Sequence, residues 1–239
     1  MQIKSTFIIT CMALCFIKEA KADIVPTINP IATYTNDDGN EESGTSYSGS
    51  APLAVAFTPN AQNTDGWATT YEWKFFLNNQ TEPYLIRYEE NTSYTFTTAG
   101  SHKIELYAIF VQGTDTIAYT QEYWSEATPI TIEISESSLN MPNAFSPNGD
   151  NINDIYKAKD GYKSIVEFHA YIFNRSGQKI YEWTNPSEGW NGTHHGIAAK
   201  DGVYFCLVKA KGADGRIFNI KTDVNLLRGY KESNSNSSE

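Results

Sequence analysis

Apolar residues recur at every second position in several segments of this chain, and this period constrains the fold most strongly. Leu53, Val55 and Phe57 alternate with other residues, and the same spacing recurs over 71–75, 94–96, 104–110 and 130–134. A β-strand places successive side chains on opposite faces of a sheet, so one buried face requires this spacing. No sustained helical period follows residue 22. The pattern predicts an all-β protein.

Turn-forming residues separate the alternating segments. Asp65-Gly66, Ala99-Gly100 and Gln112-Gly113 are pairs typical of turns, and the residues at 36–39 read Asn-Asp-Asp-Gly. The alternation continues beyond residue 140, where Asp201-Gly202 and Asp214-Gly215 separate further strands. Short strands at this spacing are typical of antiparallel sandwiches. The sequence therefore predicts two tandem Ig-like antiparallel β-sandwiches.

Charge divides the chain near Met141. Residues 23–140 contain 16 acidic and three basic residues, whereas residues 141–239 contain 11 acidic and 12 basic residues. This shift predicts a domain boundary, with a short link over 135–142. The acidic front part argues against nucleic acid and anionic lipid as partners, because both bind cationic surfaces. A simpler interpretation is that the negative charge keeps the protein in solution.

The first 22 residues have the organisation of a signal peptide. Lys4 supplies a positive charge, 7–17 is a short apolar run, and Ala20-Lys21-Ala22 is a small-x-small cleavage site. The run is shorter than the ~20 residues that span a bilayer. We therefore expect a mature chain that starts at Asp23, passes through the periplasm and has no membrane span.

Cysteine usage excludes an intrachain disulfide in the mature chain. Two of the three cysteines lie within 1–22, which leaves Cys206 alone. A reactive thiol needs an exposed and electropositive setting. Cys206 stands instead inside an apolar strand, between Phe205 and Leu207. We expect a buried or half-buried thiol without a catalytic role.

The front part, over 23–138, resembles PKD-type Ig-like domains. The segments that carry this resemblance are SGSAPLAVAF at 48–57, YEWKF at 71–75 and SYTFTTAGSHKIEL at 93–106. Residues 76–79 replace the Gly-Asp-Gly turn that is usual in these domains, and 78–80 with 84–90 indicate an added hairpin. Trp73 is expected in the core. Trp67 and Trp124 lie in less regular segments, where exposed rings could contact a sugar or a protein.

The back part, over 139–228, carries five separated motifs. They are NAFSPNGDNIND at 143–154, YIFNRSGQKIYEW at 171–183, GWNGTHHG at 189–196, DGVYFCLVKAKGADGR at 201–216 and VNLLR at 224–228. In this order they resemble the gliding-motility-associated C-terminal domain of Bacteroidetes, the type B sorting signal of the type IX secretion system. The positions that match are Asn143, Phe145, Pro147, Asn148, Gly149, Asp150, Asn153, Asp154, Phe173, Asn174, Arg175, Gly177, Trp190, Gly192, Asp201, Gly202, Tyr204 and Arg228.

This resemblance implies an address rather than a catalyst. It implies export across the outer membrane as a folded protein, and recognition by the outer-membrane pore of the secretion system and by a PorP/SprF-type barrel. The protein would then be a component or a sensor of that system. The alternative is a surface adhesin that binds a host protein or a glycan through its front part. The polar extension over 229–239 departs from the family, which usually stops near Leu-x-Arg, and we expect it to be disordered.

Two polar clusters could bind metal. Asn148, Asp150, Asn153 and Asp154 offer the oxygen ligands that Ca²⁺ prefers, although their spacing is not that of an EF-hand. The alternative for this loop is a set of Asx turns. His194-His195 lacks spaced partner ligands and is expected to be a solvated loop rather than a Zn²⁺ site.

No catalytic pattern is evident in the sequence. It has no Ser-His-Asp arrangement, phosphate-binding loop, HExxH motif or dinucleotide fingerprint. Adjacent carboxylates such as Glu89-Glu90 are common in any acidic domain, and a small sandwich leaves little room for the cleft of a glycosidase. The sequence therefore predicts a non-enzymatic protein without a resident cofactor.

Overall fold

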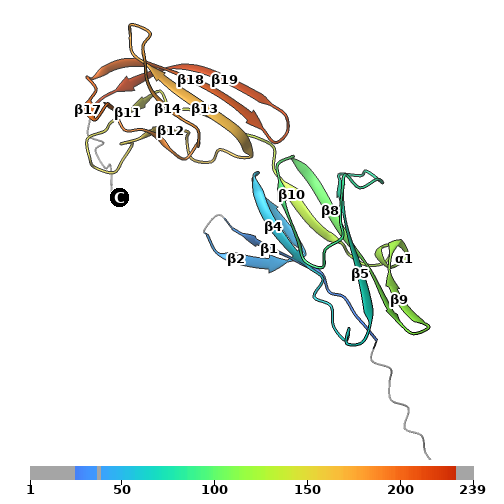
Figure 1. Ribbon diagram of the computed structural model, residues 1–239. Helices are drawn as coiled ribbons and strands as arrows, with labels where there is room; N and C mark the ends of the chain where they lie inside the picture. Colours follow the sequence, from blue (N-terminus) through green and yellow to red (C-terminus); the bar gives the residue numbers. More distant parts are fainter. Residues whose placement is uncertain (1–24, 37–38, 230–239) are drawn as a thin grey trace, which may run out of the picture.

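The computed structural model describes residues 25–36 and 39–229, and it is almost entirely β (Figure 1). The predicted signal peptide at 1–22 and all but Gly229 of the predicted polar tail lie outside the described residues. Two β-rich bodies follow each other along the chain (Figure 1). We call them the front sandwich, residues 25–135, and the back sandwich, residues 139–228. Within the described ranges, no helix is long and apolar enough to cross a membrane.

The front sandwich has two sheets. One is antiparallel, in the order β2 (Glu41–Gly44), β1 (Ile31–Thr35), β4 (Leu53–Thr58), β7 (Thr92–Phe96). The other has the order β3 (Ser46–Gly49), β10 (Ile130–Ile134), β8 (Gly100–Gln112), β5 (Ala68–Leu77), β6 (Leu85–Arg87), and β9 (Asp115–Tyr119) pairs with β8. Only β3 and β10 run parallel among the described strands of this sheet. The β5–β6 pair confirms the added hairpin.

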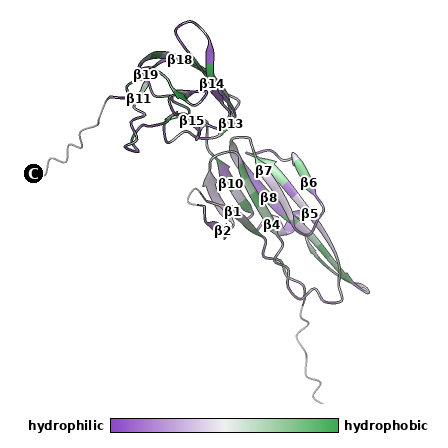
Figure 2. Ribbon diagram, turned by 60° about the vertical axis from the view of Figure 1, so that its left-hand side comes forward, coloured by the Kyte–Doolittle hydropathy of each residue, from purple (hydrophilic) through white to green (hydrophobic). Residues whose placement is uncertain are grey.

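Aromatic side chains from both sheets fill the front core. Trp73 is fully buried, and its ring lies 5.8 Å from that of Phe57 on the opposite sheet. Phe75 packs edge-on against Phe57 at 5.4 Å. The Trp73 indole N–H donates to the carbonyls of Glu89 and Glu90. The core position predicted for Trp73 is confirmed. Figure 2 shows hydrophobic and hydrophilic residues interleaved along these strands.

Of the two tryptophans in less regular segments, Trp124 is buried and does not have the exposed ring that the sequence allowed. Trp124 ends the short helix α1 (Gln121–Trp124), is 8% exposed, and its indole N–H donates to the carbonyl of Leu106 at 2.9 Å. Trp67 is half-buried against the front core. A single helical turn after β9 folds the chain back over the sheet, and a four-residue helix has no period that the sequence could reveal.

The back sandwich has one large sheet. Its order is β11 (Ala144–Phe145), β19 (Ile217–Leu226), β18 (Gly202–Gly212), β13 (Ile165–Phe173), β14 (Lys179–Trp183). Two short ribbons complete the unit: β12 (Tyr156–Lys157) with β15 (Gly189–Trp190), and β16 (Thr193–His194) with β17 (Ile197–Ala198). Tyr156 and Trp190 from the first ribbon are fully buried in one cluster with the inner face of β18 and β19.

Burial alternates along the strands of the back sheet as the sequence predicts. Ile172 is buried, whereas its neighbours Tyr171 and Phe173 point to the other face and are half-buried. Cys206 is 3% exposed, and burial raises the pKa of its thiol to about 11. The predicted burial of Cys206 is confirmed, and its thiolate form is disfavoured.

Hydrogen bonds join the two sandwiches. The Ser164 hydroxyl of the back sandwich accepts from the Ala51 N–H of the front sandwich at 3.1 Å. Within the back sandwich, the Ser164 carbonyl accepts from the Ala213 N–H at 2.9 Å. The Ala213 carbonyl accepts in turn from the Ala99 N–H at 3.0 Å, and the Ala213 side chain is counted in the front core. We call this contact the joint. Its small residues let the backbones of the two sandwiches approach closely.

The segment between the sandwiches is also tied to the back sandwich. The Asp214 carboxylate accepts from the Ser137 hydroxyl at 2.6 Å and from the Ser137 N–H at 3.1 Å. These bonds lower the pKa of Asp214 to about 2, with the Ser137 hydroxyl as the largest cause. A Cβ on Gly212 would overlap the Ser137 side chain. The joint therefore holds the β18–β19 turn against the residues that follow the front sandwich.

Candidate functional site

The matched motif residues gather at the end of the back sandwich that lies away from the joint. β13 leaves the joint after Ser164 and ends at Phe173, and β18 starts at Gly202 and returns toward Ala213. An 11-residue strand is ~35 Å long. We call the far end, formed by 143–154, 174–177, 190–202 and 226–228, the distal end (Figure 1).

A loop of Asx turns opens the distal end. Asp154 accepts from the backbone N–H groups of Gly149 and Asn151, both at 2.8 Å. Asn148 accepts from the N–H of Asp150, and Asp150 accepts from that of Ile152. The bond from Gly149 is the largest cause of the lowered pKa of Asp154. The loop thus satisfies its own backbone through short polar side chains.

These hydrogen bonds favour the Asx-turn interpretation over Ca²⁺ binding. Both oxygens of Asp154 accept backbone N–H groups, and a Ca²⁺ ion would compete for the same lone pairs. Among the described residues, no group of three or more His, Cys, Asp or Glu side chains is placed to hold a metal ion. A Ca²⁺ site at Asn148, Asp150, Asn153 and Asp154 stays a prediction.

The first and last motifs are joined by backbone pairing. β11 runs parallel to the end of β19, with Ala144 opposite Asn225. The Asn143 carbonyl accepts from the backbone N–H of Asn225, and the Phe145 carbonyl accepts from that of Leu227 at 3.1 Å. Segments about 80 positions apart in the sequence therefore form one edge of the sheet.

Arg228 joins its own segment to two others of the distal end, 143–154 and 190–202. Its guanidinium donates to the carbonyls of Pro147, Gly192 and Ala199 at 3.0–3.2 Å. Its backbone N–H donates to the Asp201 carboxylate at 3.1 Å. A planar guanidinium with several donors suits such a junction, and a lysine could not reproduce it. These contacts use the side chain and the N–H of Arg228. They therefore form although the chain continues beyond Arg228 and this residue has no free carboxyl group.

Gly192 is required by its neighbours and by its backbone. It adopts a φ of +77°, which disfavours other residues. A Cβ at this position would lie 2.9 Å from the Pro147 side chain and 3.2 Å from the Arg228 guanidinium. Gly192 therefore lets the turn after β15 approach the Pro147 and Arg228 segments.

Aromatic motif residues form the floor of the distal end. Trp190 is fully buried, with its ring 5.3 Å from Phe145 and 4.9 Å from Tyr204. Its indole N–H donates to the Thr193 carbonyl at 2.7 Å, and the Tyr204 hydroxyl donates to the carbonyl of Lys200. These motif positions are packing residues, so a partner cannot touch most of their surface.

The β13–β14 hairpin supplies an exposed part of the distal end. Asn174 accepts from the N–H groups of Ser176 and Gln178, and Gly177 has a φ of +80°. Arg175 is exposed at the tip. The tip borders a hollow that is also lined by residues 200–204, so the Phe173–Gly177 motif lies next to Asp201 and Gly202. The structure thus brings matched positions from all five motifs to one end, whereas the last residues of the fourth motif, 212–216, lie at the joint.

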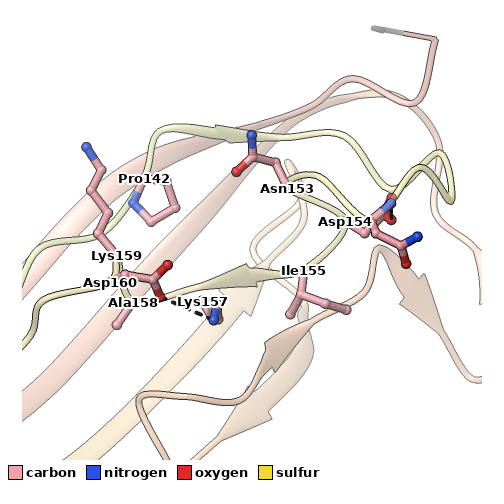
Figure 3. A pocket seen from close by; sticks show the side chains of 9 residues that line it. Pro142, Asn153, Asp154, Ile155, Lys157, Ala158, Lys159 and Asp160 are labelled. Atoms are coloured by element: carbon pink, nitrogen blue, oxygen red, sulfur yellow. Dashed lines mark hydrogen bonds and ion pairs between the residues drawn. The ribbon is translucent and has the colours of Figure 1, made fainter. Parts of the chain in front are cut away.

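A second hollow, of about 650 Å³, lies beside the Asx loop (Figure 3). Asn153 and Asp154 line one part of it, and Lys157, Lys159 and Asp160 line another, with the Lys157–Asp160 ion pair at 3.4 Å. The two lysines were not among the sequence-predicted site residues. They lie outside the five motifs, so only tertiary contact reveals them.

His194 and His195 are neighbours that lie in different environments. The Nδ1 atom of His194 lies 2.9 Å from the Ile180 carbonyl, whereas His195 is exposed with a φ of +50°. Their rings are 4.1 Å apart. Among the described residues, no group of three or more His, Cys, Asp or Glu side chains that could hold a metal ion includes them. The interpretation of this segment as a loop rather than a Zn²⁺ site therefore still holds.

Comparisons with known proteins identify the back sandwich. Residues 139–221 match the family model of the CHU_C type IX secretion signal domain. A search among curated proteins gave no match. A solved structure, the crystal structure of a tetra-tandem repeat in the extending region of a large adhesion protein, aligns over 86% of this chain and 68% of that chain. It is 11% identical with a TM-score of 0.26, a likeness too low to carry an argument.

The family match ends at Lys221, whereas β19 continues to Leu226 and Arg228 closes the distal end. The signal domain implies interaction with the secretion system and delivery to the cell surface or the medium. The back sandwich therefore matches a type IX secretion signal domain, and this match supports a cargo protein that the type IX secretion system exports.

Proposed function

We propose that the distal end is the surface that the secretion system recognises, and that it docks on a PorP/SprF-type outer-membrane barrel after passage through the periplasm. The convergence of separated motifs on this one end supports the proposal. Among these motif residues, the exposed positions, such as Arg175, Asp150 and Asn153, are the ones a partner could touch.

The recognised form would be the folded back sandwich. Arg228 contacts Pro147, Gly192 and Ala199, which lie far apart in the sequence. This surface exists only after the last strand has paired, so an unfolded chain presents none of it. Recognition of the distal end would thus select cargo whose back sandwich is complete.

The front sandwich supports a non-enzymatic role. It is a single small unit with an aromatic core, and its sequence contains no catalytic constellation. The joint connects it to the signal domain through the hydrogen bonds from Ala51 to Ser164 and from Ala99 to Ala213. A protein of this form would stay docked on the barrel as a component or a sensor of the secretion system.

Surface localisation tests the export step. The full chain, a chain truncated after Asn140, and the variant Arg175→Ala are compared by protease treatment of intact cells. We expect cleavage of the full chain, none of the truncated chain, and reduced cleavage of Arg175→Ala. Lys209→Ala is the matched control, because Lys209 is an exposed cation in the middle of the back sheet. Surface delivery of the truncated chain would refute the role of the back sandwich as the address.

Crosslinking tests the partner. A photoreactive residue at position 175 should recover an outer-membrane barrel from intact cells, and one at position 209 should recover much less. Equal recovery from both positions, or recovery of the export pore alone, would contradict docking of the distal end on such a barrel.

A surface-binding cargo is the second candidate function. Trp124 is buried and cannot supply the contact expected of it. Tyr88 is 67% exposed and Tyr84 is 39% exposed, so aromatic contacts from the front sandwich rest on tyrosines instead. Binding of an external protein or glycan by the exported full chain would support this candidate.

A further inference from the structure

Two of the three basic residues of the front sandwich lie side by side on the outer face of its larger sheet. Lys74 is on β5 and Lys103 is on the neighbouring strand β8. In the register of these strands Lys74 stands opposite Glu105, and Lys103 stands opposite Phe76. In a region with 16 acidic residues, this grouping makes one patch unlike the rest of the surface.

Each of these lysines has both an acidic and an aromatic partner. The Lys103 ammonium lies 2.8 Å from the Glu105 carboxylate and 4.4 Å from the centre of the Phe76 ring. The Lys74 ammonium lies 3.5 Å from Glu72 and 3.8 Å from the centre of the Tyr107 ring. The patch therefore combines two ion pairs with two aromatic rings, and its charges balance one another.

This patch is the floor of a groove of about 670 Å³. The β5–β6 loop at 78–83 forms one side, and Gln121 at the start of α1 lines the groove as well. The loop is held in place, because the Asn78 N–H donates to the Ser101 carbonyl at 2.6 Å and its side chain accepts from the Ser101 N–H. The groove is a formed feature of the fold and does not depend on a partner.

The side chains at the rim have unused hydrogen-bonding capacity. Asn79, Gln80 and Gln121 line the groove, and their amides make no hydrogen bond to any described residue. A primary amide presents donors and an acceptor together, which matches the alternating donor and acceptor capacity of neighbouring sugar hydroxyls. Thr81 and Glu82 add further oxygen atoms beside them.

We propose that this groove binds a neutral oligosaccharide. The negative charge of the surrounding sandwich disfavours anionic polymers, and the charged and amide side chains of the lining disfavour an apolar peptide. The inference rests on the proposed function in one respect, since export is what brings the front sandwich to glycans outside the cell. It deepens the surface-binding candidate by naming a site and a ligand class.

Titration of the purified protein tests the site. Cellohexaose, xylohexaose, mannohexaose and chitohexaose serve as neutral probes, and hexagalacturonate serves as the acidic probe, followed by calorimetry and by amide NMR shifts. We expect binding of at least one neutral probe, with shifts confined to 74–82, 103–107 and 121. The double variant Gln80→Ala/Gln121→Ala should weaken binding about fivefold or more, because two amide–hydroxyl hydrogen bonds are lost.

The matched control is Gln62→Ala, which removes an exposed amide of the same sandwich outside the groove. It should leave affinity unchanged. Binding of none of the neutral probes, preference for hexagalacturonate, or full affinity in the double variant would overturn the proposal. These outcomes are separate from export, because the purified protein has not passed through the pore. A loss of surface delivery in Arg175→Ala says nothing about this groove.

Discussion

The two sandwiches of this protein reach a similar size by different means. The described front sandwich packs two sheets face to face around Trp73, Phe57 and Phe75. The back sandwich has one large sheet, and short ribbons and loops cover it. In the loops and turns of the back sandwich, polar side chains satisfy backbone groups. Arg228, Asp154 and Asn174 each hydrogen-bond to the backbone of such a segment.

The difference teaches why the sorting motif looks conspicuous in the sequence. Asx turns, positive-φ glycines and an arginine junction each need a particular residue at a particular place. Sheet-on-sheet packing needs only apolar residues of about the right volume at alternating positions. The back sandwich therefore carries readable motifs, whereas the front sandwich carries a periodic pattern that many sequences share.

Trp73→Ala should have the largest effect on stability. Removing a fully buried indole from the front core costs ~3–5 kcal/mol, because the cavity cannot collapse completely. Hydrogen exchange resolved by peptide should show loss of protection in β4, β5 and β8, with the distal end retained. Trp67→Ala, at a half-buried position, should cost less. Equal loss of protection in both sandwiches would show that their cores do not unfold independently.

Arg228→Ala should destabilise the back sandwich by ~2–3 kcal/mol, because three carbonyl groups lose a charged donor. Urea unfolding measures the change, with hydrogen exchange at 143–147 and 190–199 as the local readout. Arg228→Lys should restore little of the loss, since an ammonium cannot reach all three carbonyls. Full rescue by lysine would mean that charge, and not the guanidinium geometry, closes the distal end.

Gly192→Ala should cost ~1–2 kcal/mol, from a positive φ and from crowding against Pro147 and Arg228. Gly196→Ala is the matched control, because Gly196 has a similar φ of +76° and open space around its Cα. Thermal unfolding of the two variants separates backbone strain from crowding. Identical unfolding midpoints would show that the Pro147 and Arg228 side chains move aside without a loss of stability.

Ser164→Ala should cost ~1 kcal/mol, since the buried N–H of Ala51 loses its acceptor. Its more informative effect is on cooperativity. The joint should couple the unfolding of the two sandwiches, and calorimetry of the variant should show two transitions further apart than in the parent. Ser176→Ala, at the opposite end of the back sandwich, is the control. An unchanged temperature difference between the two transitions would mean that the joint does not couple the unfolding of the two sandwiches.

The smallest effect is expected from the pH dependence of Asp214. Its pKa in the folded chain is about 2, below the ordinary value of 3.8, so its contribution to stability is present above pH 4. That contribution is lost as the pH falls from about 4 to about 2. Asp214→Asn should flatten this part of the stability profile, measured by urea unfolding. Asp160→Asn, at an exposed carboxylate, is the control.

Much of the fold could be predicted from the residues alone. Alternation located β4, β5, β7, β8 and β10, and it placed Trp73 and Cys206 inside. Exposure of Trp124 was the wrong prediction, because a single helical turn leaves no periodic signal and its indole N–H donates to the carbonyl of Leu106. An irregular sequence does not indicate exposure, since tertiary packing decides burial.

The sequence by itself determined the β architecture and the two-part organisation. Those features follow from local rules: strand periodicity, turn chemistry and the special φ values of glycine. Only the tertiary structure decided that Arg228 meets Pro147, Gly192 and Ala199, that Ser164 and Ala213 lock the joint, and that Lys74 and Lys103 share one groove. Such contacts join residues far apart in the chain, and their geometry exists only once the strands have paired.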